Sequence, residues 1–236
     1  MINTILLDLD GTLLPMEQDK FVNAYLSTLA KAASKHGYDP NRLISALWKG
    51  ISKEIANNGK DTNETVFWNT FADEFGQDAL LDKELFDQYY AEEFQAVKKS
   101  CGYDEMSRCV IDILKSKGYR LVLATNPVYP KVATEARMRW AGLDKEDFEL
   151  YTTYEDCSYC KPNLKYYEEI LKKLNCDPKE CLMVGNDVDE DMIASKLGMK
   201  TFLLTNCLIN KKNSDLSQYR QGNFKDLLIY IEELSN

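Results

Sequence analysis

One change of pattern constrains the fold of this chain more than any other feature: an apolar N-terminal segment precedes a long helical block, and alternating strands and helices follow. Residues 2–9 are rich in Ile and Leu and precede Gly11, which predicts a buried strand that ends in a turn. From residue 101 onward, helical patterns alternate with strand patterns, as in a parallel sheet joined by right-handed helical crossovers. Because the first strand belongs to that sheet, residues 16–99 are an insertion behind it.

The insertion carries amphipathic stretches with no strand pattern between them. These stretches begin near Phe21, after Pro40, after the capping residue Thr62 and near Phe86. In the rest of the chain we expect strands at 120–124, 148–152, 181–184 and 201–204, and helices at 105–117, 131–140, 162–174, 191–197 and from residue 224. We therefore predict an α/β fold with a core formed by residues 1–15 and 100–236 and an inserted all-helical domain formed by residues 16–99.

The composition excludes several classes of protein. Of the 236 residues, 44% are hydrophobic and 28% are charged, which excludes a disordered or low-complexity chain. The net charge of -9 argues against nucleic acid as a partner, because phosphate contacts need Lys and Arg. There is no apolar run of about 18 to 20 residues and no basic leader, so we expect a cytoplasmic protein that does not enter a membrane. The oligomeric state stays open.

The cysteines offer one candidate metal or redox site. Cys157 and Cys160 have the CxxC spacing of such a pair. A structural zinc site needs a second pair of ligands, and His36 is the only histidine of the chain. We therefore interpret most of the cysteines as small buried hydrophobic residues.

Polar side chains follow four of the predicted strands at the point where each strand ends. They are Asp8 and Asp10, then Thr125 and Asn126, then Lys161, and finally Asp187 with Asp191 four residues on. Because the carboxyl ends of parallel strands meet at one edge of the sheet, where open α/β sheets bind ligands, these side chains define a site.

The chemistry of these side chains suits a phosphoryl group and a hard cation. Two carboxylates about 4 Å apart repel by about 4 kcal/mol at an effective dielectric constant near 20. A cluster of Asp8, Asp10, Asp187 and Asp191 therefore needs a cation, and an all-oxygen ligand set indicates Mg²⁺. A threonine hydroxyl and a lysine ammonium can hold phosphate oxygens, and an aspartate can attack phosphorus to form an aspartyl-phosphate.

Four sequence motifs resemble those of the haloacid dehalogenase-like (HAD) hydrolase superfamily. They are LDLDGTLL at 7–14, LATN at 123–126, CKPN at 160–163 and VGNDVDED at 184–191, in the family's order, and the resemblance covers the whole chain. It implies a Rossmann-like, HAD-like core with a C1-type helical cap. It also implies a Mg²⁺-dependent phosphatase that hydrolyses a small phosphorylated metabolite through an aspartyl-phosphate.

The resemblance also assigns roles to the residues of the first three motifs. Asp8 matches the nucleophile, whose carboxylate also binds Mg²⁺. Asp10 matches the general acid–base, and its backbone carbonyl contacts the metal. Thr125 and Lys161 match the phosphate-binding pair, and Asn126 either contacts the phosphate or orders the end of the strand.

The fourth motif departs from the family pattern at one position. Many members have Gly-Asp where this chain has Gly185, Asn186 and Asp187. The four-residue spacing to Asp191 favours Asp187 as the direct metal ligand and Asp191 as the acid that holds metal-bound water or Lys161. Taken alone, Asp187 and Asp191 would be interpreted as caps of the helix that follows them, and only the joint pattern of the four motifs overturns that interpretation.

Other functions stay open beside the phosphatase. A phosphomutase with the same cap and a non-catalytic sensor of Mg²⁺ and phosphate both fit the motifs. Because every proposed chemical group lies outside the insertion, we predict that the insertion is a lid with hinges near Pro15 and Gly102 that selects the substrate. The candidate specificity residues within it are Trp48, Lys49, Lys53 and the loop 57–60.

Several side chains near the motifs are expected to lie outside the chemistry, namely Arg137, Arg139, Asp189, Glu190, Tyr151, Tyr154 and Tyr159. We expect the two arginines at the surface or between the domains, and the two acids to face water. The tyrosines either line the mouth of the site or pack.

Overall fold

The computed structural model describes residues 1–235 and has a six-stranded parallel sheet at its centre. The strands are β1 (Thr4–Leu7), β2 (Arg120–Leu123), β3 (Leu150–Tyr151), β4 (Cys181–Gly185), β5 (Lys200–Leu204) and β6 (Arg220–Gly222). They lie in the order β3-β2-β1-β4-β5-β6, and every neighbouring pair is parallel. The chain runs outward from β1 to β3 and then returns to β4 on the other side of β1. The carboxyl ends of β1 and β4 therefore border the point where the strand order reverses, which is where such sheets bind ligands.

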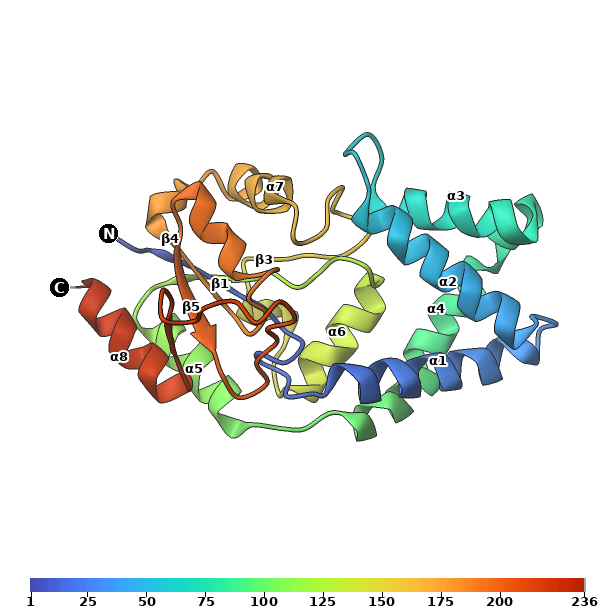
Figure 1. Cartoon of the computed structure of the whole chain (residues 1–236). Coiled ribbons are helices and arrows are strands. Elements are labelled where there is room, and N and C mark those ends of the chain that lie inside the picture. The colour runs from blue at the N-terminus through green and yellow to red at the C-terminus, as the bar shows by residue number, and fades with distance from the viewer. Residues whose placement is uncertain (236) are drawn as a thin grey trace.

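Helices cover both faces of this sheet, because alternate residues of a strand point to opposite faces (Figure 1). The helices outside the insertion are α5 (Glu105–Ser116), α6 (Lys131–Trp140), α7 (Leu164–Leu174) and α8 (Phe224–Ser235). Ile5 and Leu7 of β1 belong to the same buried cluster as residues of α5, α6 and α8. Leu6, between them in the sequence, packs in a second cluster with residues of α7. The predicted α/β fold is confirmed.

The insertion between β1 and β2 is helical, as predicted, and lies at one end of the molecule, away from both termini (Figure 1). Its helices are α1 (Gln18–Ser34), α2 (Pro40–Ile55), α3 (Asn63–Phe75) and α4 (Lys83–Ala91), with 3₁₀ segments at Gln77–Asp82 and Glu93–Ser100. Asp39 caps α2 by accepting a hydrogen bond from the Arg42 amide, and Thr62 caps α3 by accepting one from the Thr65 amide.

Two chain segments, one on each side of the insertion, lie side by side where it joins the rest of the chain. Met16 and Cys101 form an antiparallel bridge, and the Gly102 amide donates a 2.7 Å hydrogen bond to the Pro15 carbonyl. Aromatic side chains continue the core across this junction, since the rings of Phe94 and Trp140 lie 4.9 Å apart between centroids. The phenylalanines on the periodic helical faces of the insertion, such as Phe21, Phe71 and Phe94, are packing residues, because they fill the interior of the helical bundle.

The structure departs from the expected elements in three places. The predicted strand at 148–152 shrinks to the two residues of β3, and the predicted helix at 191–197 is a 3₁₀ segment, Met192–Leu197. Strand β6 was not predicted, because its sequence, Arg-Gln-Gly, is polar and mostly exposed at the edge of the sheet. Within residues 1–235, no helix is both long enough and apolar enough to cross a bilayer.

Candidate active site

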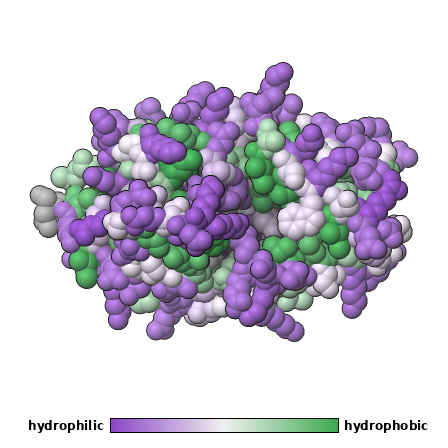
Figure 2. Space-filling view, viewed as in Figure 1, coloured by the Kyte–Doolittle hydropathy of each residue, from purple (hydrophilic) through white to green (hydrophobic). Residues whose placement is uncertain are grey.

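A cavity of about 650 Å³ lies between the carboxyl ends of the strands and helices α1 and α2. In the space-filling view a recess separates the two parts of the molecule, and hydrophobic side chains border it on the side of the insertion (Figure 2). The residues that the sequence predicted for the chemistry line this cavity together, namely Asp8, Asp10, Thr125, Asn126, Asp187 and Asp191. Lys161 does not line the cavity, but it contacts two of these aspartates from behind.

Asp8 and Asp10 reach the same cavity because the chain turns directly after β1. The Asp8 amide still donates to the Val184 carbonyl of β4, at 2.9 Å, so its position is fixed by the sheet. The next residues form a tight turn in which Gly11 has a φ of +83°, a conformation that favours glycine. Thr12, within this turn, donates from its hydroxyl to Asp8 Oδ2 at 3.0 Å.

Asp10 is paired with Arg137, which corrects the expectation that this arginine is a surface or interdomain charge. Arg137 is fully buried, and its Nη1 donates to Asp10 Oδ2. Its guanidinium also stacks on the ring of Tyr129, 4.3 Å from the centroid. Burial raises the pKa of Asp10, and the neighbouring Arg137 charge opposes that rise. The other carboxylate oxygen of Asp10 is buried without a hydrogen-bond partner among the described residues.

The spacing of apolar residues in the sequence of α6 already indicated that Arg137 is buried. Ala133 and Trp140 are both buried, and Arg137 lies on the same face of α6, four residues after the first and three before the second. A charged residue on a buried helical face has to find a partner. Arg139, in contrast, is exposed and only 3.9 Å from Glu135, as expected for a surface charge.

Lys161 connects the first and fourth motifs. Its Nζ donates to Asp8 Oδ1 at 3.0 Å and to Asp191 Oδ1 at 2.6 Å, and its side chain is 1% exposed. Burial disfavours the ammonium, but the two carboxylates outweigh burial and raise the pKa of Lys161 well above its usual value. The site therefore holds a fixed positive charge beside Asp8.

The carboxyl end of β4 positions Asp187 and Asp191. Asp191 Oδ2 accepts a 3.0 Å hydrogen bond from the Asp187 amide. Asp187 Oδ1 accepts from the amides of Asp189 and Glu190, at 2.8 and 3.0 Å. Asp187 thus closes the turn before the segment Met192–Leu197, and Asp191, the N-cap of that segment, makes no side-chain capping hydrogen bond to it. Gly185 is needed here, because a Cβ at that position would overlap the Asp191 carboxyl group.

Asn186, the residue that departs from the family pattern, has a packing role. Its Nδ2 donates to the Cys207 carbonyl at 2.6 Å, and its Oδ1 accepts from the Thr12 hydroxyl at 3.1 Å. The side chain also lies directly over Gly11. Because both ends of the amide are engaged, Asp187 is the residue of this pair with a carboxylate at the cavity.

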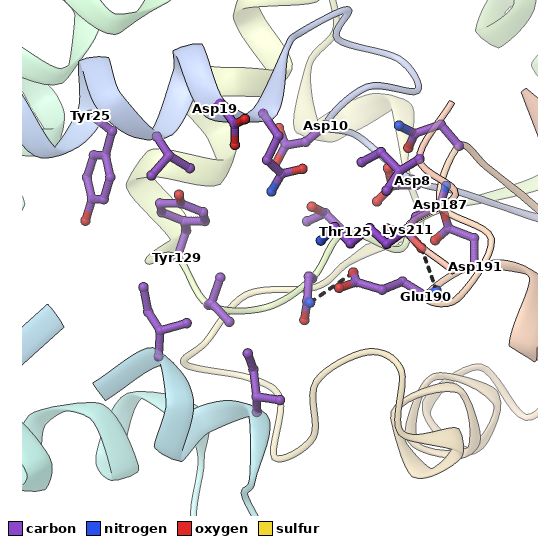
Figure 3. A pocket seen from close by; sticks show the side chains of 18 of the residues that line it. Asp8, Asp10, Asp19, Tyr25, Thr125, Tyr129, Asp187, Glu190, Asp191 and Lys211 are labelled. Atoms are coloured by element: carbon purple, nitrogen blue, oxygen red, sulfur yellow. Dashed lines mark hydrogen bonds between the residues drawn. The ribbon is translucent and has the colours of Figure 1, made fainter. Parts of the chain in front are cut away.

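Asn126 orders the loops around the cavity. Its Oδ1 accepts from the Lys161 amide at 3.2 Å, and its Nδ2 donates to Glu190 at 3.1 Å (Figure 3). Glu190 therefore does not simply face water, as expected from the sequence: it lines the cavity, and burial raises its pKa to about 7. Asp189 does reach the surface, where it pairs with Lys212 at 2.9 Å.

The carboxylates of the cavity only partly match the Mg²⁺ site that the sequence predicts. Among residues 1–235, no three His, Cys, Asp or Glu side chains stand close enough to share one ion. The four aspartates therefore line one cavity without converging on one point, because Asp10 turns to Arg137 and Asp191 turns to Lys161. Their chemistry still fits Mg²⁺, since the donors are carboxylate oxygens and one of them, Asp10 Oδ1, is buried without a partner.

Cys157, Cys160 and the three tyrosines noted in the sequence, Tyr151, Tyr154 and Tyr159, lie outside the cavity. Cys157 and Cys160 are buried free thiols. Of the tyrosines, Tyr154 accepts from Trp68 Nε1 at 3.2 Å, and Tyr159 donates to the Asn58 carbonyl at 3.2 Å. Tyr151 donates to Glu135 at 2.7 Å, so the packing interpretation holds for all three.

Only one of the candidate specificity residues lines the cavity, and that residue is Trp48. Loop 57–60 instead docks on the 153–160 segment, where Gly59 packs against the Tyr159 ring and leaves no room for a Cβ. Lys49 pairs with Glu74 at 3.8 Å. The residues that the sequence missed are the apolar ones of α1 and α2, such as Val22 and Ile51, whose helical spacing indicated only packing.

Comparison with known proteins places these features in a family. The sequence model of the haloacid dehalogenase-like hydrolases matches residues 2–198. A glyceraldehyde 3-phosphate phosphatase of Methanothermobacter thermautotrophicus is 33% identical over 96 residues, which are 39% of this chain and 39% of that protein. The pyrophosphatase PpaX of Bacillus anthracis is 24% identical over an alignment of 238 positions that covers 99% of this chain and 98% of that protein.

Solved structures share the fold over nearly the whole chain. A 2-haloacid dehalogenase from Pseudomonas syringae pv. Tomato has a TM-score of 0.63 at 21% identity and covers 99% of this chain and 100% of its own. A HAD phosphatase from Thermococcus onnurineus has a TM-score of 0.57 at 19% identity, with 98% of each chain covered. The HAD-hydrolase YfnB from Bacillus subtilis, bound to magnesium, has a TM-score of 0.57 at 16% identity, with 98% and 99% covered.

Proposed function

Since this chain belongs to the haloacid dehalogenase-like hydrolase family, we propose that it is a Mg²⁺-dependent phosphatase that hydrolyses a phosphate monoester through an aspartyl-phosphate on Asp8. One observation carries the proposal: Asp8 stands at the end of β1 with a buried ammonium, Lys161 Nζ, 3.0 Å from its carboxylate. The phosphatase relatives support a phosphorylated small molecule as the substrate.

The proposed hydrolysis has two steps, and Asp8 and Asp10 act in both. In the first, an Asp8 oxygen attacks phosphorus, the bond between phosphorus and the ester oxygen breaks, and Asp10 gives its proton to the leaving oxygen. In the second, Asp10 takes a proton from water, the water oxygen attacks phosphorus, and Asp8 is released with inorganic phosphate. Burial raises the pKa of Asp10, which suits the proton transfer of the first step, and the charge of Arg137 opposes that rise.

The residues around Asp8 and Asp10 would offset the charge of the phosphoryl group and keep the reacting groups in position. We assign the phosphoryl oxygens to Thr125, which lines the cavity, and to Lys161, which would approach them from behind Asp8. Asp8, Asp187 and the Asp10 backbone carbonyl would hold Mg²⁺, which neutralises the charge of the transferred group when bound. Asp191 holds Lys161 in place through a 2.6 Å contact.

Substitution of the two aspartates tests this mechanism. We expect Asp8→Asn to abolish both turnover of p-nitrophenyl phosphate and formation of a phosphoenzyme. Asp10→Asn keeps the nucleophile but loses proton transfer, so turnover should fall by about 10²- to 10⁴-fold. Wild-type turnover by Asp8→Asn would refute the proposal. A stable phosphoenzyme that passes phosphate to an added alcohol rather than to water would instead identify a phosphomutase.

Metal removal tests the cofactor. We expect EDTA to abolish turnover and added Mg²⁺ to restore it, because the neighbouring carboxylates otherwise repel the phosphate. Full turnover in EDTA, with no metal carried through purification, would contradict the Mg²⁺ mechanism.

A further inference from the structure

The cavity has two ends of different chemistry. Asp8, Asp187 and Asp191 lie at one end, and Tyr25 and Tyr129 lie at the other, against α1 and α2 (Figure 3). The far wall is apolar, and its aliphatic and indole side chains are Val22, Leu26, Trp48, Ile51, Ile55 and Val128. A cavity of about 650 Å³ is far larger than a phosphate group requires, so most of it is space for the leaving group.

The far end contains no cation for a second anionic group. Among the described residues, Lys211 is the only basic side chain that lines the cavity, and it lies beside Asp8 and Asp187 (Figure 3). Arg137 is close to the far end behind Tyr129, but its charge is paired with Asp10. A leaving group with a carboxylate or phosphate there would lose its hydration without gaining a counter-charge.

A carboxylate between the two ends makes binding of an anion at the far end still less favourable. Asp19 lines the cavity between its two ends and forms no ion pair within residues 1–235 (Figure 3). Glu54 is fully buried in α2, and neither of its carboxyl oxygens has a hydrogen-bond partner in the described part of the chain. Glu54, next to Ile55 in α2, therefore supplies no counter-charge for an anion at this wall.

Neutral polar groups complete the lining. The side chains of Gln18 and Asn23 and the Tyr129 hydroxyl all border the cavity, and none of them has a hydrogen-bond partner among residues 1–235. Such groups can bind hydroxyl or carbonyl groups of a ligand without needing an opposite charge.

We propose that the substrate is the phosphate monoester of a bulky alcohol with an apolar face and no acidic group of its own, and that Trp48 and Ile55 select it. This inference rests on the proposed phosphatase function. The substrate proposed for this chain differs from the one named for its relative, the pyrophosphatase PpaX, because pyrophosphate is small and its leaving group is anionic.

A matched set of primary phosphate esters tests the inference. 2-Phenylethyl phosphate carries a bulky apolar group, ethyl phosphate a small one, and phosphoglycolate a small anionic one. We expect kcat/KM for 2-phenylethyl phosphate to exceed that for ethyl phosphate by about tenfold or more, and that for phosphoglycolate by a larger factor. An equal or higher kcat/KM for phosphoglycolate would overturn the inference.

Two substitutions on the far wall sharpen the test. Trp48→Ala should lower the kcat/KM ratio of 2-phenylethyl to ethyl phosphate by about tenfold, because the buried apolar contact is lost. Ile55→Lys should raise the ratio of phosphoglycolate to ethyl phosphate by about tenfold, because it supplies the missing charge. Leu81, 80% exposed in the insertion and outside the cavity, provides the controls Leu81→Ala and Leu81→Lys, which should leave both ratios unchanged. Unchanged ratios in the Trp48 and Ile55 variants would refute the roles of these residues.

A binding measurement separates failure of this inference from failure of the proposed function. The Asp8→Asn variant keeps the cavity, and Trp48 is an exposed tryptophan, whereas Trp68 and Trp140 are buried, so its fluorescence reports on the far wall. We expect 2-phenylethyl phosphate to change this fluorescence at a concentration about tenfold lower than phosphoglycolate does. If no ester is hydrolysed and no phosphoenzyme forms, the phosphatase proposal fails, and this ratio still decides the ligand class. Equal affinities would overturn the inference.

Discussion

At the scale of single residues, Arg137 has the largest predicted effect on Asp10. Arg137→Met removes the partner of a buried carboxylate, so we expect the free energy of unfolding to fall by about 3–5 kcal/mol. Turnover should also fall by about 10- to 100-fold, because Asp10 loses the contact that orients it. Arg139→Met is the matched control, because that side chain is exposed and its weak pair should contribute at most about 1 kcal/mol. Equal effects of the two substitutions would contradict this role for Arg137.

The burial of Glu54 predicts that the free energy of unfolding depends on pH. Burial without partners raises the pKa of Glu54 well above 4.5, so the folded protein holds a proton that the unfolded chain has already released. The free energy of unfolding should therefore fall by about 1.4 kcal/mol per pH unit as pH rises from the unfolded value to the folded one. The stabilisation is complete below the unfolded value and lost above the folded one.

The isosteric variant Glu54→Gln isolates this effect. It should remove this part of the pH slope, as measured by denaturant unfolding between pH 5 and 8, and it should be more stable than wild type at the alkaline end. Glu93→Gln, an exposed glutamate of the same insertion, controls for loss of a surface carboxylate. An unchanged slope in Glu54→Gln would mean that Glu54 ionises without cost where it is buried.

At the scale of secondary-structure elements, the start of α3 connects the insertion to two loops of the site. Asn63 donates from Nδ2 to the Pro127 carbonyl at 3.1 Å and to Cys160 Sγ at 3.3 Å. Pro127 follows Asn126, and Cys160 precedes Lys161, so one buried amide holds both loops. Asn63→Ala should lower the free energy of unfolding by about 1–3 kcal/mol, because it leaves buried acceptors unpaired.

Asn58→Ala is the matched control for Asn63→Ala. Asn58 is exposed, and within residues 1–235 its side chain accepts a single hydrogen bond, from the Lys60 amide at 3.1 Å. We expect no measurable change in unfolding for this variant. If Asn63→Ala were equally harmless, the contact between α3 and the site loops would not hold them together.

The order of the elements was predictable from the sequence, and their tertiary partners were not. Hydrophobic periodicity located β1, β2, β4, β5 and the helices of both parts, because each buries one face. Strand β6 gave no such signal, since Arg220 and Gln221 are exposed at the sheet edge. The motifs predicted the aspartates that line one cavity and Lys161, which contacts two of them from behind. The partner of Asp10 comes from α6, whose spacing places Arg137 on a buried face but does not identify the residue it contacts. Docking of loop 57–60 away from the cavity likewise depends on long-range contacts such as Tyr159 with Asn58.

At the scale of the whole molecule, backbone hydrogen bonds join the insertion to the rest of the chain at two places of different kinds, beside side-chain contacts such as Trp140 with Gln95. At the paired linkers, the Gly102 amide donates to the Pro15 carbonyl at 2.7 Å. Across the cavity, the amides of Asn63 and Glu64 donate to the carbonyls of Cys157 and Tyr154 at 2.8 and 2.9 Å. If the insertion is a lid with its hinge at the linkers, opening must break the second contact and can preserve the first.

Amide hydrogen exchange distinguishes these two contacts in the intact protein. Addition of Mg²⁺ and orthovanadate, an analogue of the transferred phosphoryl group, should favour the closed state and slow exchange at Asn63 and Glu64, because their hydrogen bonds then open less often. Exchange at Gly102 should change little, since the hinge keeps its hydrogen bond in both states. Because both sets of amides are measured in one sample, a general stabilisation by the ligand would slow all three and can be recognised. Slowing of all three to the same extent, or of none, would show that the insertion does not move as a lid about Pro15 and Gly102.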